Sequence, residues 1–144
     1  MRLEYREALP EAPRALRELD HVVAASTLEP SLRDLVKVRA SQINGCSYCV
    51  DLHTREATAA GEDVQRLHLL AVWREAPVFT ARERAALAWT EALTRLPETG
   101  APDDVYAEVA RVFDPAEQVA LTVAVIAING WNRLAVGFRR LVGD

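Results

Sequence analysis

The sequence predicts a single all-α domain of six to seven helices over residues 1–144. Helix-start and helix-stop signals recur along the whole chain, whereas no stretch alternates apolar and polar residues long enough to indicate a strand. Half of the residues are hydrophobic and 26% are charged, a balance typical of a globular protein with a packed core. The length of 144 residues fits one domain and leaves little room for a second.

Four helices are expected in the first half of the chain. Proline is favoured in the first turn of a helix, so Pro30 can open the second one. Asn44 or Gly45 then interrupts the chain and can cap the third helix, which holds both cysteines and ends at Gly61. The first and fourth helices are expected over residues 13–25 and 63–74.

Two capping boxes mark the strongest helix starts in the second half. In each, a polar side chain caps the first turn and a glutamate three residues later caps it in return, as in Thr80 with Glu83 and Asp114 with Glu117. The final helix is apolar on most sides, so we expect it to be buried in the core or at a subunit interface. The expected helices of this half cover residues 80–94, 103–113 and 115–141.

Charge and hydropathy exclude several classes of protein. The net charge is -4 and no run of basic residues stands out, so nucleic acid is not an expected partner. The N-terminus lacks the apolar stretch of a signal peptide. The longest nearly unbroken apolar run, residues 119–128, is too short for a membrane span of about 20 residues. We therefore expect a cytoplasmic protein with no membrane partner, in a compartment where cysteine pairs are more often catalytic or metal-binding than structural.

The two cysteines are the most informative feature of the sequence. Cys46 and Cys49 are the only cysteines, they are three residues apart, and His53 follows one turn after Cys49. Because each helical residue advances by about 100°, the three side chains fall within an arc of about 60° on one helical face. This spacing places both sulfurs and an imidazole within reach of one another.

Such a cluster favours thiol-disulfide chemistry. A thiol at a helix N-terminus is stabilised as the thiolate by unpaired backbone N–H groups and by the helix dipole. A neighbouring imidazole can accept the thiol proton, and the thiolate then attacks a peroxide oxygen or a disulfide sulfur. A second thiol three residues away can close a disulfide before oxidation becomes irreversible.

Two other interpretations of the cluster remain open. The cysteines could be small core residues with His53 as a structural partner. Alternatively, the three residues could bind structural zinc, which commonly takes four ligands as two separated pairs. The sequence has no second Cys or His pair, so a metal is not expected. A thioredoxin fold is poorly supported, because the strands it requires are absent.

The sequence around this cluster resembles a known family. The string Ser41-Gln-Ile-Asn-Gly-Cys-Ser-Tyr-Cys-Val-Asp-Leu-His53, within the longer match over 35–57, resembles the core of the AhpD-like alkylhydroperoxidases of the carboxymuconolactone decarboxylase superfamily. The resemblance continues over residues 70–89 and resumes at 128–133. It implies an AhpD-like helical fold, a homo-oligomer such as a trimer or a hexamer, and thiol-dependent reduction of peroxides without a cofactor.

The resemblance also assigns roles to four residues. Cys49 would react with peroxide, Cys46 would resolve the oxidised thiol, and His53 would belong to the proton relay. The acid of that relay, usually glutamate, lies twelve residues before the first cysteine, which is Asp34 here. Aspartate is one methylene shorter, so a bridging water is expected between Asp34 and Cys46. The decarboxylases of the superfamily are expected to lack the cysteine pair, which favours redox chemistry here.

We therefore expect a thiol peroxidase that acts on a peroxide substrate and is re-reduced by an external dithiol or redox protein. The alternative is a redox adaptor or sensor that exchanges disulfides with a partner protein. Tyr48 is expected to point away from the cysteines. Further candidates fall in predicted helices: Trp73, Trp89 and Trp131 are expected in the core or an interface, and Asn129, Asn132 and Arg133 either line the pocket or tie subunits together.

Overall fold

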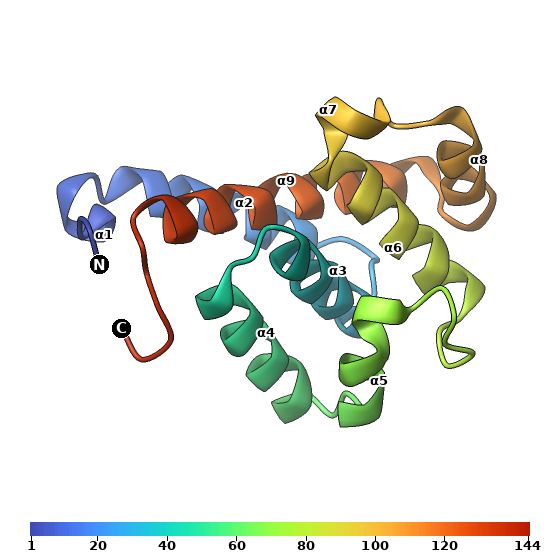
Figure 1. Ribbon diagram of the computed structural model, residues 1–144. Helices are drawn as coiled ribbons and strands as arrows, with labels where there is room; N and C mark the ends of the chain where they lie inside the picture. Colours follow the sequence, from blue (N-terminus) through green and yellow to red (C-terminus); the bar gives the residue numbers. More distant parts are fainter.

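The computed structural model describes residues 1–144 and contains helices but no strand, which confirms the all-α prediction (Figure 1). The predicted count of six to seven helices is too low, because α1 and α7, which have only four residues each, were not predicted. The elements are α1 (Tyr5–Ala8), α2 (Glu11–Ala24), α3 (Pro30–Ile43), α4 (Ser47–Ala59), α5 (Val64–Leu69), the 3₁₀ turn η1 (Leu70–Val72), α6 (Ala81–Thr94), α7 (Leu96–Thr99), α8 (Asp103–Val112) and α9 (Pro115–Gly137).

Several helix ends are found where short sequence signals predicted them. Both predicted capping boxes are present, at the starts of α6 and α9. Gly61, with φ of 97°, ends α4, and the N–H of the next residue, Glu62, reaches back to Ala57 O at 2.9 Å. Glycine adopts this left-handed conformation without a steric penalty, so the expected stop at Gly61 is confirmed.

Other predicted boundaries are wrong. The first long helix begins at Glu11 rather than near Pro13, and the helix expected over residues 63–74 gives way to the 3₁₀ turn η1. Helix α9 ends at Gly137 rather than Leu141. There Arg139 takes the left-handed conformation, with φ of 57°, and Arg140 N–H bonds Ala135 O at 2.8 Å. This is the same type of helix stop as at Gly61, but the left-handed residue is an arginine, so the sequence contains no glycine that would predict the stop.

Helices α3 and α9 form the centre of the fold, as Figure 1 shows. Helix α3 packs against α4, α6 and α9, and α9 also packs against α2 and α6. The larger core cluster lies between these helices and includes Val36, Leu121 and Val125. The position of α3 matters for function, because its C-terminal end leads directly into the turn that precedes the cysteines.

Helix α9 meets the length and composition of a membrane span, with a mean hydropathy of 1.5 over its most apolar stretch. Half of that stretch is buried inside the fold. The apolar run noted in the sequence is therefore part of a longer helix of 23 residues. A central core helix of a soluble protein has the same composition.

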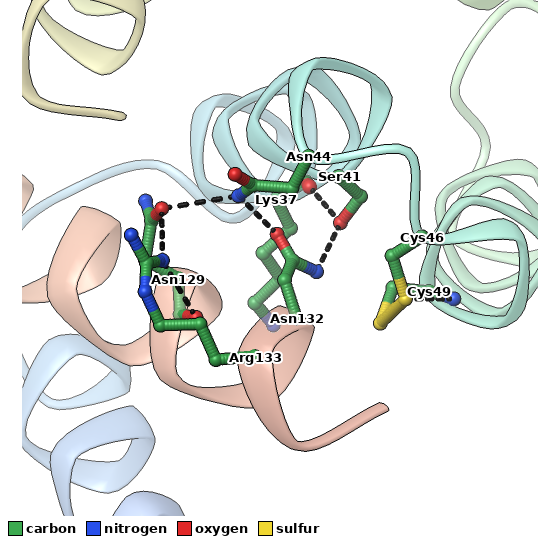
Figure 2. Close-up of a disulfide and its surroundings, with 8 residues drawn as sticks. All are labelled: Lys37, Ser41, Asn44, Cys46, Cys49, Asn129, Asn132 and Arg133. Carbon is green, nitrogen blue, oxygen red and sulfur yellow. Dashed lines mark hydrogen bonds between the residues drawn. A yellow bond between two sulfur atoms is a disulfide. The ribbon is translucent and has the colours of Figure 1, made fainter. Parts of the chain in front are cut away.

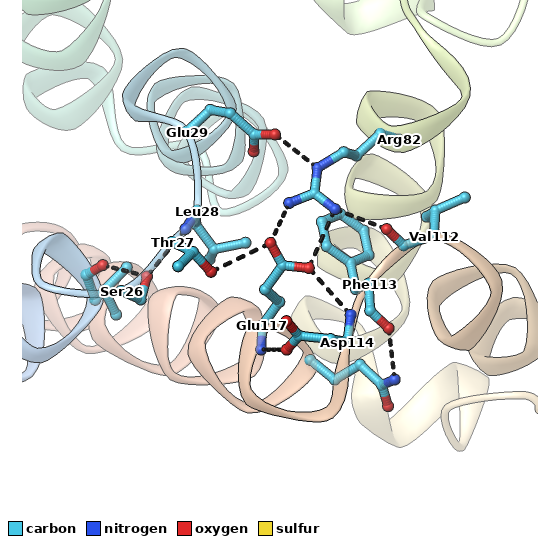
Figure 3. A network of polar contacts seen from close by, with 11 residues as sticks. Ser26, Thr27, Leu28, Glu29, Arg82, Val112, Phe113, Asp114 and Glu117 are labelled. Carbon is cyan, nitrogen blue, oxygen red and sulfur yellow. Dashed lines mark hydrogen bonds and ion pairs between the residues drawn. The ribbon is translucent and has the colours of Figure 1, made fainter.

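A polar network around Arg82 joins three parts of the chain (Figure 3). The Arg82 guanidinium donates to Glu29 at 2.7 Å, to Glu117 at 2.6 Å and to the carbonyl of Val112 at 2.6 Å. It also lies 4.2 Å from the centre of the Phe113 ring. The N-terminal end of α6 is thereby fixed to the start of α3 and to the turn between α8 and α9.

Candidate functional site

The turn between α3 and α4 positions the cysteine pair. Gly45 has φ of 64° in this turn, and the expectation that Asn44 or Gly45 caps the next helix is wrong, because Cys46 is the N-cap residue. The Cys46 Sγ accepts a hydrogen bond from the Cys49 N–H at 3.3 Å. Cys46 therefore lies just outside α4, whereas Cys49 and His53 lie within it.

Cys46 and Cys49 are joined by a disulfide, with their Cα atoms 5.3 Å apart (Figure 2). This agrees with the expectation that the sulfurs are within reach of each other. Both residues are buried, with exposed fractions of 2% and 3%, and they pack against Ala135 of α9. The pair thus sits at the contact between the start of α4 and the C-terminal half of α9.

An amide network fixes the preceding turn to α9, as Figure 2 shows. The Asn44 Nδ2 donates to Asn129 Oδ1 at 3.0 Å and to Asn132 Oδ1 at 2.9 Å. Asn132 in turn donates to Ser41 Oγ at 3.0 Å, and Arg133 donates to Asn129 Oδ1 at 2.8 Å. These asparagines were predicted either to line the pocket or to tie subunits together. Within the chain they hold α3 and the cysteine turn against α9.

A cavity of about 330 Å³ opens beside the disulfide. Cys49 contributes to its lining, whereas Cys46 does not. The other lining residues come from α1, α2, α3, α4 and α9: Tyr5, Arg6, Arg17, Asp20, Lys37, Tyr48, Leu52, His53, Glu56, Trp131 and Ala135.

Two of these residues contradict the sequence interpretation. Tyr48 was expected to point away from the cysteines, but its side chain packs against their cluster and lines the cavity. Trp131 was expected in the core or an interface, but it lines the cavity and its Nε1 donates to Asp20 at 2.8 Å. By contrast, Trp73 is buried in the core as predicted.

His53 lines the same cavity as Cys49, with a side chain that is only 13% exposed. Its Nδ1 lies 2.9 Å from Glu56 Oε2, and no hydrogen bond joins it to either sulfur. Burial lowers the pKa of His53 below its usual value near 6.5, although the Glu56 hydrogen bond acts in the opposite direction. The imidazole is therefore neutral at pH 7 and able to accept a proton. Glu56 was not singled out in the sequence, because nothing local distinguishes it from other exposed helical glutamates.

Asp34 lies on α3, half-buried, and does not line the cavity. Its side chain makes no hydrogen bond or ion pair. Burial raises the pKa of Asp34, with the carboxylate of Glu56 adding to the shift and the charge of Lys37 opposing it. Cys49 and His53 therefore line one cavity, and Cys46 is bonded to Cys49, whereas Asp34 lies outside the cavity lining.

No group of three His, Cys, Asp or Glu side chains is arranged as metal ligands would be. His53, the nearest histidine to the cysteines in sequence, is instead paired with Glu56. The arrangement beside the disulfide is a small cavity with one sulfur, one neutral imidazole and several charged groups on its wall.

Comparison with known proteins agrees with this geometry. The carboxymuconolactone decarboxylase family matches the chain over residues 10–92, which is more than half of its length. The chain belongs to the carboxymuconolactone decarboxylase family. Two relatives of known sequence are uncharacterised. YdfG of Bacillus subtilis (strain 168) is 34% identical over 135 residues, which cover 94% of this chain and 92% of YdfG. YnjA of Escherichia coli (strain K12) is 32% identical over 113 residues, which cover 78% of this chain and 59% of YnjA.

Solved structures of other proteins share the fold of this chain. A protein from Agrobacterium tumefaciens superposes with a TM-score of 0.93 at 48% identity, covering 96% of this chain and 95% of its own. It is described as a protein of unknown function and a candidate antioxidant defence protein, AhpD. The debrominase Bmp8 has the same fold, with a TM-score of 0.82 at 18% identity over 93% of this chain and 73% of its own. Within the carboxymuconolactone decarboxylase family, this chain is therefore AhpD-like, as the resemblance implied.

Proposed function

We propose that the protein is a thiol peroxidase in which Cys49 reduces the peroxide and Cys46 resolves the oxidised thiol. The observation that supports this division of roles most directly is that Cys49 lines the cavity and Cys46 does not. A peroxide in the cavity would meet the sulfur of Cys49 first. The buried Cys46 is then correctly placed to receive the oxidised sulfur rather than the substrate.

In the first step, His53 takes the proton of the Cys49 thiol, and the thiolate attacks the terminal oxygen of the hydroperoxide. The O–O bond breaks and an S–O bond forms. Cys49 becomes a sulfenic acid, and the alkoxide leaves as the alcohol after taking the proton from His53. Glu56 acts as the positioning residue, because its contact with Nδ1 leaves the other imidazole nitrogen free.

In the second step, the Cys46 thiol attacks the sulfenic sulfur of Cys49. A disulfide forms and water leaves. An external dithiol, either small or part of a redox protein, then returns two electrons and two protons and is itself oxidised to a disulfide. In this proposal the disulfide form of the protein is the one that reacts with the reductant. We place this cycle in the cytoplasm, where such dithiols are maintained in the reduced form.

A redox adaptor that exchanges disulfides with a partner protein would use the same two cysteines. The volume of the cavity, about 330 Å³, favours a small molecule over a protein as the group that reaches Cys49. It lies at the lower end of the range of about 300–1,000 Å³ that is typical of small-molecule sites.

The deciding experiment compares two rates. Loss of an alkyl hydroperoxide is followed in the presence of a dithiol, beside the rate of disulfide exchange with a small disulfide. Fast peroxide turnover that Cys49→Ser abolishes supports the peroxidase. Fast exchange without turnover would show an adaptor instead. Mild peroxide should also lower the intact mass of the reduced chain by two hydrogens, because the bond closes within one chain.

A further inference from the structure

Lys37 is the only lysine among the 17 basic residues of the chain, and the other sixteen are arginines. Arginine supplies the ion pairs that join the helices, such as Arg82 with Glu117 and Arg39 with Glu91. Lys37 is half-buried on α3 and makes no ion pair. Figure 2 shows its side chain extending from α3 toward α9, and it lines the cavity together with Cys49.

The charges on the cavity wall do not balance. Arg6, Arg17 and Lys37 are cationic, and none of them forms an ion pair. Two carboxylates face the same space, but each already has a donor: Trp131 donates to Asp20, and Glu56 is paired with the ring of His53. The three cations outnumber the two carboxylates on the wall, so the wall is suited to an additional negative charge.

The rest of the wall is suited to an apolar body. Its apolar lining residues include Tyr5, Tyr48 and Trp131, which carry rings, and Leu52. Rings of this kind bind flat or aliphatic groups by burial of apolar area. A small organic molecule with one anionic end satisfies both parts of the wall.

We infer that the substrate of this site is an organic hydroperoxide that bears a carboxylate, with Lys37 binding the carboxylate while Cys49 meets the peroxide oxygen. This inference rests on the proposed peroxidase function. Lys37 would donate to the carboxylate through its ammonium group, and the hydroperoxide would be reduced to the corresponding alcohol as described above.

The test uses a matched pair of substrates. Cumene hydroperoxide is prepared with a carboxylate or with a carboxamide at the ring position opposite the hydroperoxide, so that size and reactivity are similar. The ratio of the two kcat/KM values cancels any effect of a mutation on the thiol itself. We expect the parent protein to favour the carboxylate by about tenfold or more, the effect of one charge-assisted hydrogen bond.

Three variants accompany the parent. Lys37→Met keeps the apolar stem and removes the charge, so the ratio should fall close to one. Lys37→Arg keeps the charge and should keep the preference. Arg95→Met removes an exposed charge that does not line the cavity and should leave the ratio unchanged. An equal rate with both substrates in the parent would overturn the inference and leave the peroxidase standing.

A binding measurement separates the two proposals. The inert alcohol products, one with the carboxylate and one with the carboxamide, are titrated by calorimetry into the parent and into Lys37→Met. If neither peroxide is turned over, the peroxidase proposal fails. Preferential binding of the carboxylate that Lys37→Met abolishes would still support the anion-binding role of Lys37. Equal binding of the two products would overturn it.

Discussion

His53 illustrates how one buried residue sets the conditions for the proposed chemistry. Burial lowers its pKa, so the ring is a neutral base over a wider range of pH than a free imidazole. In the folded state the neutral form is favoured. The stability that folding gains from neutral His53 is therefore complete above the ordinary histidine pKa near 6.5. That stability is lost as the pH falls through the lower pKa that His53 has in the folded protein.

Replacing this base should slow the reaction. In His53→Ala we expect the pKa of Cys49 to rise and the peroxide rate to fall by about 10²–10⁴-fold, the usual effect of removing a general base. Alkylation of the reduced protein over a range of pH measures the thiol pKa directly. Glu56→Gln keeps an acceptor for the ring and should cost less. If His53→Ala and Glu56→Gln both match the parent, the helix terminus alone activates the thiol and His53 is a packing residue.

The stability contributed by Asp34 depends on pH in the opposite direction to that of His53. Burial raises its pKa, so the folded state favours the protonated acid, and the stability that this provides is complete below the ordinary pKa near 3.8 and is lost as the pH rises through the folded value. At neutral pH the half-buried carboxylate is therefore destabilising. Asp34→Asn should raise the Tm at pH 7, and this gain should shrink as the pH approaches 3. A lower Tm at pH 7 would contradict it.

The activity of Asp34 variants tests the relay separately. Asp34→Glu introduces the glutamate that the family resemblance implies at this position and should keep or improve the peroxide rate, whereas Asp34→Asn should reduce it. A side chain retained at a cost to stability is expected to serve a function. The peroxide rates of the two variants, measured beside their Tm values, distinguish a role in the relay from a purely structural one.

At the scale of elements, Arg82 joins the start of α6 to α3 and α9. Its donors hold Glu29 and Glu117, and the hydrogen bond from Arg82 keeps the pKa of Glu117 below its usual range. We expect Arg82→Met to lower the free energy of unfolding by about 1–3 kcal/mol at pH 7, because it leaves acceptors unpaired at the joint between α6 and α9. Urea denaturation measures the change.

Two comparisons sharpen this expectation. A lowered pKa means that the contribution of Glu117 is complete above pH 4.5 and is lost as the pH falls, so the effect of Arg82→Met should be smaller in acid. Arg111→Met removes an exposed pair with Glu108 and should change stability by less than about 1 kcal/mol. Equal losses in both variants would mean that Arg82 is no more than a surface charge.

Elements whose signals are local could be predicted from the sequence. The capping boxes at Thr80 and Asp114 and the glycine stop at Gly61 depend on contacts within a few residues, and all three are present. The stop at Arg139 could not be predicted, because a non-glycine residue adopts the left-handed conformation there. Short helices such as α1 have too few residues for a periodic pattern to be recognised.

Some residues of the candidate site could likewise be predicted from the sequence, and others could not. Cys46, Cys49 and His53 could be predicted, because their spacing within one segment already places them together. Lys37 and Trp131 could not, since their relevance depends on how α3 and α9 pack against α4. Residues from five helices converge on the cavity, and a single sequence holds no direct signal of that convergence.

At the scale of the whole molecule, α9 exposes apolar side chains that a monomer does not need. Val119, Ile126 and Val136 are 64%, 54% and 40% exposed. On a helix these positions fall within an arc of about 100°, so they form one stripe. Exposed apolar stripes of this kind are usually covered by a partner. We expect a homo-oligomer, a trimer or a hexamer, with this stripe in its interface.

Light scattering tests this assembly. The chain mass is 15.9 kDa, so a single species near that mass at micromolar concentration would contradict the expectation. Ile126→Glu places a charge in the stripe without disturbing the core and should dissociate the oligomer. Arg55→Met, on α4 and outside the groove that Ile126 lines, serves as the control and should leave the mass unchanged.

Because the chain has a single lysine, proteolysis at that lysine can be used to measure unfolding. A protease specific for lysine can cut the chain only after Lys37, in the middle of α3, and α3 is packed between α4, α6 and α9. The native protein should therefore resist digestion that rapidly divides the urea-unfolded chain into fragments 1–37 and 38–144. The cutting rate then measures how often the centre of the molecule opens. Rapid cutting of the native protein would instead show that α3 opens locally while the rest stays folded.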